Sequence, residues 1–356
     1  MKTGTTYVQQ ILAHNRARLA EAGVLYPKPW SSQVKAVRDV LALEGGSHLG
    51  SVDGAWAGLV EQIHAWPGRE VVLSMEFLSF ANKKQVARIV DDFAPSDVTV
   101  VMGVRDLARG VPAQWQTSVR NGSSWSYGQF LEELTLRRPS RSKLHFWKRQ
   151  DTGRIAARWA DAVGAENVTV VTVPPRGAPP NLLWERMSRA LEIDVVAREQ
   201  RATSNESLGP TATELLRRVN AQSESIEMDE GVYQQAVNRS LSHAVLPGIS
   251  EPHPPLTVPE PFHDWVRRES ERVVKEITGS GVTVIGELGD LEPQLTASAF
   301  VWPEDLTAEE LLGAAVEALT AYTNLVGQRQ ESEAGRGRTK RRRRPRGATA
   351  EKTAAG

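Results

Sequence analysis

Short apolar runs rich in β-branched residues alternate with helix-like stretches along most of this chain. Such runs are typical of strands that are buried on both faces, and the helices between them cover those faces. The pattern therefore predicts an α/β fold, in which a parallel sheet lies between two layers of helices. The expected strands are Val71–Ser74, Val98–Val104, Val168–Val173 and Val282–Ile285.

The helix-like stretches carry apolar side chains at helical spacing. The expected helices are Thr5–Ala22, Trp56–Ala65, Lys83–Phe93, Leu107–Arg120, Arg154–Val163, Leu182–Leu191, Thr213–Asn220, His263–Thr278 and Ala308–Leu325. A proline-rich break at Pro247–Pro261 suggests that a helical lobe begins at about residue 250. We expect one α/β domain over residues 1–326 and a disordered basic tail over residues 327–356, where apolar residues become rare.

Positive and negative charges are equal in number but unevenly distributed. The chain has 43 basic and 43 acidic residues. From Arg329 onward there are ten basic and three acidic residues, which leaves 33 basic and 40 acidic residues before that point. The body is therefore acidic and the tail basic. The tail could contact anionic surfaces, and no specific nucleic-acid partner is expected.

Composition also excludes several classes of site. The chain has no cysteine, which excludes disulfides, thiol catalysis and thiolate metal sites. No apolar run reaches the roughly 18 residues of a membrane helix, and the first fifteen residues lack the apolar stretch of a secretory signal. A cytoplasmic protein without a membrane span is expected, and no metal site is indicated.

The first residues form a candidate anion-binding loop, Lys2-Thr3-Gly4-Thr5-Thr6, at the start of a predicted helix. The glycine lets backbone N–H groups approach an anion, and the hydroxyl groups donate further hydrogen bonds. The positive end of the helix dipole points to the same place, and Lys2 adds a full charge. The common nucleotide-binding loop has its lysine after the last glycine, whereas Lys2 precedes the glycine here.

This residue order, followed by the aromatic Tyr7, resembles the 5′-phosphosulfate loop of the sulfotransferase superfamily. Those enzymes have a P-loop-NTPase-like fold and transfer a sulfuryl group from 3′-phosphoadenosine 5′-phosphosulfate (PAPS) to an acceptor. The resemblance in layout extends over roughly residues 1–325 and is closest to bacterial members. It implies that Lys2 contacts the phosphosulfate and stabilises the leaving oxygen. It also implies that the loop from Thr3 to Thr6 holds the phosphate, and that Tyr7 stacks on the adenine.

A second candidate follows the strand that ends at Val104. Arg105 is placed where ligands bind in open α/β sheets, outside the carboxyl end of a strand. Sulfotransferases have an arginine at this point that binds the 3′-phosphate, and a serine eight residues later that assists it. Here that later position is Ala113, and Ser118 is among the nearby polar substitutes. The alternative role of Arg105 is an ion pair with Asp106 or Glu76.

A third candidate, Glu76, follows the predicted strand Val71–Ser74. A carboxylate among apolar neighbours has a raised pKa and suits a general base. The resemblance places a glutamate or histidine near this region to take the proton from the acceptor. Glu76 is our choice, with Ser74 as a helper and His145 as the alternative base.

Three functions remain open from the sequence. The first is a PAPS-dependent sulfotransferase that acts on a hydroxyl or amine. The resemblance suggests a carbohydrate or glycolipid as the acceptor class. The second is a catalytically inactive nucleotide-binding protein, which Ala113 favours. A P-loop nucleotide kinase is the third, although the loop lacks a lysine after its glycine. The strand that should precede the loop is missing before Met1, so we expect the natural start to lie upstream.

Overall fold

The strands of this protein form two small parallel sheets. The computed structural model describes residues 3–43, 50–136, 146–194, 208–295 and 300–342. In the first sheet, β1 (Val24–Leu25) pairs with β2 (Glu70–Val71). In the second, β3 (Val100–Val104), β4 (Val168–Thr172) and β5 (Thr283–Ile285) are adjacent in that order. The predicted α/β class is confirmed, but the expected single sheet is two sheets.

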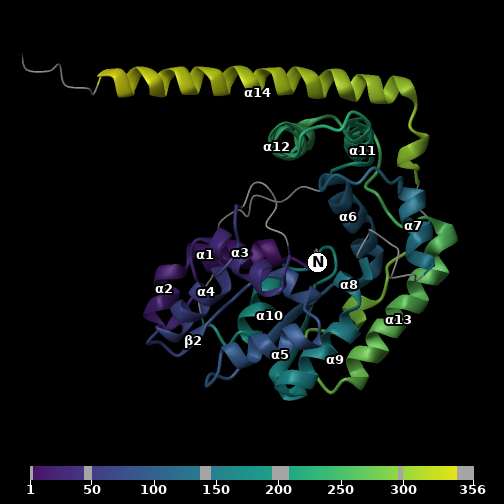
Figure 1. Ribbon diagram of the computed structural model, residues 1–356. Coiled ribbons are helices and arrows are strands. Elements are labelled where there is room, and N and C mark those ends of the chain that lie inside the picture. Colours follow the sequence, from purple (N-terminus) through teal and green to yellow (C-terminus); the bar gives the residue numbers. More distant parts are fainter. Residues whose placement is uncertain (1–2, 44–49, 137–145, 195–207, 296–299, 343–356) are drawn as a thin grey trace, which may run out of the picture.

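Helices make up most of the described chain (Figure 1). They are α1 (Thr5–His14), α2 (Arg16–Glu21), α3 (Trp30–Val40), α4 (Ala55–His64), α5 (Lys83–Asp92), α6 (Leu107–Arg120), α7 (Tyr127–Thr135), α8 (Phe146–Gln150), α9 (Thr152–Val163), α10 (Leu182–Ala190), α11 (Pro210–Ser225), α12 (Glu230–Val232), the π-helix Tyr233–Val245, α13 (His263–Gly279) and α14 (Ala308–Arg342). The described helices include none that is both long enough and apolar enough to cross a membrane.

Side chains of β3 point alternately to the two faces of its sheet. Val100 and Met102 pack with the side chains of α9, and Val104 packs with those of α13. Val101 points the other way, into a cluster formed by α1 and α10. This alternation is the period of two expected for a strand, and it leaves the sheet covered by helices on both faces.

The largest hydrophobic cluster lies among helices rather than on a sheet. Trp115, Tyr127, Phe130 and Phe146 are fully buried there, and they come from α6, α7 and α8. The π-helix and parts of α11, α13 and α14 complete the cluster. The molecule therefore has a helical half beside its α/β half, and α6 belongs to both because it follows directly from β3.

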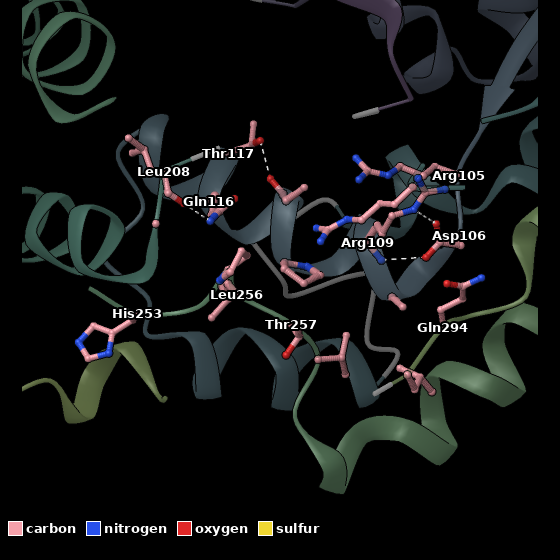
Figure 2. Close-up of a pocket in the computed structure, with 18 of the residues that line it drawn as sticks. Arg105, Asp106, Arg109, Gln116, Thr117, Leu208, His253, Leu256, Thr257 and Gln294 are labelled. Carbon is pink, nitrogen blue, oxygen red and sulfur yellow. Dashed lines mark hydrogen bonds and ion pairs between the residues drawn. The ribbon is translucent and has the colours of Figure 1, made fainter. Parts of the chain in front are cut away.

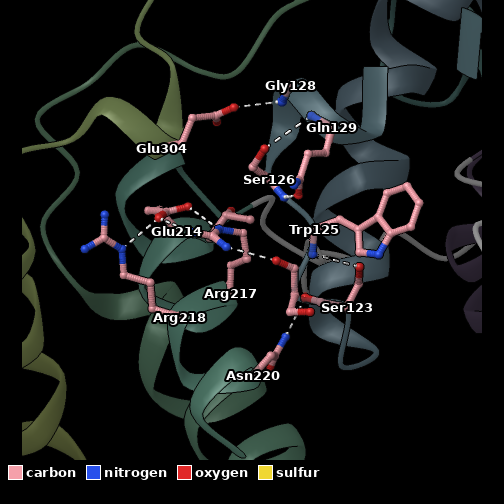
Figure 3. Close-up of polar contacts among 12 residues, drawn as sticks. Ser123, Trp125, Ser126, Gly128, Gln129, Glu214, Arg217, Arg218, Asn220 and Glu304 are labelled. Carbon is pink, nitrogen blue, oxygen red and sulfur yellow. Dashed lines mark hydrogen bonds and ion pairs between the residues drawn. The ribbon is translucent and has the colours of Figure 1, made fainter. Parts of the chain in front are cut away.

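Polar side chains of α11 attach this helix to the end of α6 and the turn that follows it (Figure 3). Glu214 is fully buried and accepts hydrogen bonds from Arg217 at 2.7 Å and Arg218 at 2.8 Å. Arg217 Nη1 also donates to the Ser124 carbonyl at 2.9 Å. Asn220 Nδ2 donates to the carbonyls of Val119 and Ser123 at 2.7 and 3.0 Å. These bonds satisfy the buried charge and hold the wall of the helical half in place.

Several predicted boundaries are wrong. The single helix expected over Thr5–Ala22 is broken at Asn15, whose Nδ2 donates back to the Ile11 carbonyl at 2.9 Å. A side chain that competes for backbone acceptors ends a helix in this way. The helices α3 and α7 and the π-helix were not predicted.

The C-terminal third also differs from expectation. The residues after 250, where a helical lobe was expected to begin, contact the α/β half, because α13 packs against α9 and β5 pairs with β4. The helix α14 extends from Ala308 to Arg342 and so includes residues 327–342 of the basic segment, while residues 343–356 lie outside the described residues. Once formed, a helix gains one hydrogen bond for each residue added, and polar residues can continue it.

Candidate functional site

The opening loop forms a sharp turn at Gly4, which precedes the first residue of α1. Gly4 has a φ of +80°, in the left-handed region that favours glycine. A Cβ atom here would also overlap the side chain of Leu183. Thr5 and Thr6 occupy the first turn of α1, and Thr5 Oγ1 lies 3.3 Å from the hydroxyl of the buried Thr3. Lys2 lies outside the described residues.

This loop rests directly on β3. A Cβ atom at Gly103 would lie 2.9 Å from Thr3 Oγ1, so the close approach requires a glycine in the strand. On the same helix, Gln9 Nε2 donates to the Ser74 carbonyl at 3.0 Å. The start of α1 is therefore attached both to β3 and to the segment that follows β2.

Arg105 follows β3 directly, two residues after Gly103. Burial lowers the pKa of its guanidinium to about 10, with further lowering by the positive charges of Arg109 and Arg176, against the opposing effect of Asp106. Arg105 still carries its charge at neutral pH. The shift indicates that cationic groups are gathered in a partly dehydrated place, where a bound anion would be stabilised.

Arg109 stabilises the start of α6 through hydrogen bonds. The Asp106 carboxylate caps this helix by accepting from the backbone N–H of Arg109 at 2.9 Å, and it also pairs with the Arg109 guanidinium. That guanidinium donates to the carbonyls of Pro174 and Val173 at 2.9 and 3.3 Å. Arg109 thus joins α6 to the loop after β4.

Arg105 lines a cavity of about 750 Å³ (Figure 2). In Figure 2, Arg105, Asp106 and Arg109 lie at one side of this cavity, and Leu208 and His253 lie at the other. The walls come from α6, the loop after β4, the start of α11, and the segments 246–258 and 289–295. Its charged or titratable members are Arg105, Asp106, Arg109, Arg120, Arg176, Glu251, His253, Asp290 and Glu292.

The wall opposite Arg105 is held by Glu251. Its carboxylate accepts from the N–H and the hydroxyl of Thr211 at 3.0 and 2.8 Å, and from the N–H of His253 at 3.2 Å. The side-chain amide of Gln116 donates to the Leu208 carbonyl nearby. The segment around Glu251 is therefore attached to the N-terminus of α11 and forms a fixed boundary of the cavity.

A second charged cluster lies where β4 ends. Arg186 Nη1 donates to Asp290 at 2.6 Å and to the carbonyl of Thr172 at 2.9 Å, and the Thr172 hydroxyl donates to Asp290 at 2.6 Å. Burial alone would raise the pKa of Asp290, but the hydrogen bonds from Thr172 and Arg186 lower it below its usual value. This pair connects α10, β4 and the turn after β5.

The predicted acid and tyrosine lie outside the cavity wall. Glu76 begins the short 3-10 helix Glu76–Phe80, is half-buried, and its carbonyl accepts from the hydroxyl of Ser79 at 2.8 Å. Tyr7 is half-buried on α1, where burial and, secondarily, the charge of Glu185 raise its pKa. None of the described loop residues lines the cavity, nor does Glu76. The alternative base His145 falls outside the described residues.

Ser118 lies outside the cavity wall. Its hydroxyl donates to the Gln114 carbonyl at 3.0 Å, one turn back within α6, and the residue does not line the cavity. Ala113 and Thr117 do line it, and Thr117 Oγ1 donates to the Ala113 carbonyl at 2.8 Å. A helix turns 100° per residue, so Ser118 faces a different direction from Thr117.

Arg176 and the wall residues Glu251 and His253 were not predicted from the sequence. A signal existed for Arg176, because its proline-rich loop follows β4 and ligands bind beyond strand ends. The segment with Glu251 and His253 was interpreted as a break between domains, and its contact with α11 joins residues 40 positions apart.

The described residues contain no group of three or more His, Asp or Glu side chains arranged to hold a metal ion. None of the protein-family models, curated proteins and solved structures compared with this chain matches it.

Proposed function

We propose that this protein is a sulfotransferase that takes PAPS and transfers its sulfuryl group to a hydroxyl or amine acceptor. The observation that carries the proposal is the contact between the opening loop and β3. Thr3 lies against Gly103, and Arg105 follows two residues later. The loop and Arg105, our two candidates for anion binding, therefore lie near the same strand end, and this supports a ligand with a phosphate at each of two positions.

The loop at Gly4 suits the 5′-phosphosulfate. Backbone N–H groups at the start of α1 point out of the helix, and Thr5 and Thr6 add hydroxyl donors. Lys2 would carry the charge that stabilises the leaving phosphate oxygen. In the transfer, the acceptor oxygen or nitrogen bonds to sulfur as the sulfur–oxygen bond to the 5′-phosphate breaks. The electron pair of that bond stays on the departing 3′,5′-adenosine bisphosphate.

Arg105 suits the 3′-phosphate. A guanidinium donates paired hydrogen bonds to phosphate oxygens, and the surrounding charges of Arg109 and Arg176 favour a dianion. Glu76 remains our choice for the base that takes the acceptor proton, because Gln9 connects α1 to Ser74, two residues before it. A general base contributes about 10²–10⁴ in rate.

An inactive nucleotide-binding protein is the second candidate. Ala113 lines the cavity at the position where sulfotransferases carry an assisting serine, so one hydroxyl donor is absent there. Such a protein would bind 3′,5′-adenosine bisphosphate but release none from PAPS.

Calorimetric titration with 3′,5′-adenosine bisphosphate tests the site. We expect Arg105→Ala to weaken binding about 10- to 100-fold, because a charge-assisted hydrogen bond contributes about 1.5–3 kcal/mol. Arg88→Ala is the matched control, since Arg88 is an exposed arginine on α5 that pairs only at 3.5 Å with Asp92. Equal affinity of the wild type and Arg105→Ala, or no binding by the wild type, would contradict the site.

Release of 3′,5′-adenosine bisphosphate from PAPS, measured over a panel of sugar, phenol and amine acceptors, separates the two candidates. For a sulfotransferase, Glu76→Gln should lower release about 100-fold or more while binding of the bisphosphate is retained. Full activity in that variant would exclude Glu76 as the base. Binding without release by the wild type would support the inactive protein.

A further inference from the structure

A second, much smaller cavity lies next to the large one. Arg105 and Asp106 line both cavities, and they appear side by side in Figure 2. The small cavity has a volume of about 10 Å³. Its wall is formed by the start of α6, the junction of α8 and α9, α13, and the 3-10 helix Leu288–Leu291. Both α6 and α9 pack against α13, so the space lies among elements that hold one another in place.

Apolar side chains close one part of this wall. Val104, Leu107, Val273 and Leu291 line the space with only 2, 6, 5 and 2 % of their surfaces exposed. These side chains keep bulk solvent away from the small cavity. A polar group that faces it therefore needs a hydrogen-bond partner inside the protein.

The rest of the wall is polar and also buried. Asp106, Gln150, Thr152 and Ser270 line the space with 4, 9, 8 and 4 % of their surfaces exposed. The Thr152 hydroxyl donates to the Gln150 carbonyl at 3.2 Å, which leaves its oxygen able to accept. Hydrogen-bonding side chains from three separate parts of the chain therefore meet around one small space.

Ser270 provides an independent indication that the space has an occupant. Its Oγ is buried and has no hydrogen-bond partner among the described residues. A hydroxyl on a helix commonly bonds to the carbonyl four residues back, as Thr278 of the same helix does to Val274 at 2.8 Å. Since buried polar groups in proteins are almost always hydrogen-bonded, the Ser270 hydroxyl requires a partner in the space that it lines.

We propose that the small cavity binds one internal water molecule, which connects Ser270 of α13 to Asp106 at the start of α6. This inference does not depend on the proposed function. A volume of about 10 Å³ is about the least that accommodates one water molecule. Such a water needs about two to four polar partners, and Ser270, Asp106 and Thr152 can supply them.

The charges around the space favour a neutral occupant. The guanidinium of Arg105 opposes a cation, and the carboxylate of Asp106 opposes an anion. Each carboxylate oxygen can accept more than one hydrogen bond, so Asp106 can keep its bond from the Arg109 N–H and also accept one from water. Water can at the same time accept from the Ser270 hydroxyl. A single water molecule thus satisfies groups that the protein alone leaves unsatisfied.

A crystal structure of the full chain at about 1.8 Å or better tests the site directly. We expect one water within about 3.2 Å of Ser270 Oγ and of a carboxylate oxygen of Asp106. Three outcomes would overturn the proposal: a space without density, a Ser270 hydroxyl bonded directly to another protein atom, or density that refines as an ion.

Oxygen-17 relaxation dispersion of the solvent counts long-lived internal waters in solution. Ser270→Val removes the hydroxyl and extends a methyl group into the space, so we expect one long-lived water fewer than in the wild type. Thr278→Val is the matched control, because it removes a hydroxyl from the same helix at a residue that does not line the space. It should keep the wild-type count. Equal counts in the wild type and Ser270→Val would contradict the proposal.

A double-mutant cycle tests the link to α6 even if Ser270→Val does not fold. Ser270→Ala adds no volume and should lower the melting temperature by about 1–3 °C. Combined with Asp106→Ala, it should lower the melting temperature by less than the sum of the two single effects, because either change already breaks the water bridge. Thr278→Val combined with Asp106→Ala is the control and should be additive. Additive effects in both cycles would exclude a water that joins Ser270 to Asp106.

Discussion

Gly4 is the residue whose backbone most directly shapes the proposed anion site. We expect Gly4→Ala to lower the free energy of unfolding by about 1–2 kcal/mol for the left-handed backbone alone, with more from the overlap with Leu183. Affinity for 3′,5′-adenosine bisphosphate should fall as well, because the N–H groups of the loop would shift. Urea unfolding and calorimetric titration of the same samples measure the two effects.

Gly58→Ala provides the control for that change. Gly58 lies inside α4, where a Cβ atom would meet nothing within 4 Å, so alanine should raise the free energy of unfolding by about 0.5–1 kcal/mol. If both variants behaved alike, the special role of the Gly4 turn would be excluded.

Single residues also show what could be learned from sequence. The turn at Gly4 was predictable, because a glycine directly before an amphipathic helix has a local cause. The contact between Thr3 and Gly103 was not, because it joins residues 100 positions apart. Ser118 does not line the cavity, because a helix gives each side chain its own direction, which distance along the chain alone does not reveal.

At the scale of elements, the start of α6 depends on Asp106. This carboxylate has 5 % of its side-chain surface exposed and both caps the helix and pairs with Arg109. We expect Asp106→Ala to lower the free energy of unfolding by about 3 kcal/mol, because it removes the cap and leaves the Arg109 charge without this partner. Asp106→Asn keeps a capping oxygen, so it should isolate the loss of charge. Thermal or urea unfolding gives both values.

The capping residue Asn82 of α5 is the comparison for Asp106. It accepts from the Gln85 N–H at 3.0 Å in an exposed capping box. Asn82→Ala should cost only about 1 kcal/mol. A cost for Asp106→Ala no greater than this would show that the ion pair with Arg109 contributes little.

Elements differed in how well they could be predicted. Helices with strong local patterns, such as α6, appeared with the expected bounds, and the strands β3 and β4 were found within two residues. The helix α7 was missed although its Ser126 and Gln129 form a capping box that the sequence displays. The two-residue strand β1 was missed because so short a run has no periodicity to recognise.

At the scale of the whole molecule, the Asp290–Arg186 pair should make folding sensitive to acid. The pKa of Asp290 is lowered in the folded state, so its stabilisation is fully present above the unfolded value of about 3.9 and is lost as the pH falls through the folded value. The wild type should therefore exceed Asp290→Asn in free energy of unfolding by about 1.5–3 kcal/mol at pH 7. That difference should shrink below about pH 4.

Urea unfolding of both proteins between pH 2.5 and 7 measures this difference. Thr172→Val removes one of the hydrogen bonds to Asp290 and keeps its charge and Arg186, so it should reproduce only part of the effect. A difference that stayed constant across the pH range would contradict the linkage.

The hydrogen bonds between Thr211 and Glu251 make the cavity electrically asymmetric. The N-terminus of α11 is electrically positive, as every helix start is, and would by itself attract an anion. Glu251 already neutralises it from within the chain. A negatively charged ligand that enters the cavity is therefore repelled by the carboxylate at this wall and attracted to Arg105 and Arg176. The cavity thus has a polarity that gives an asymmetric ligand one favoured orientation.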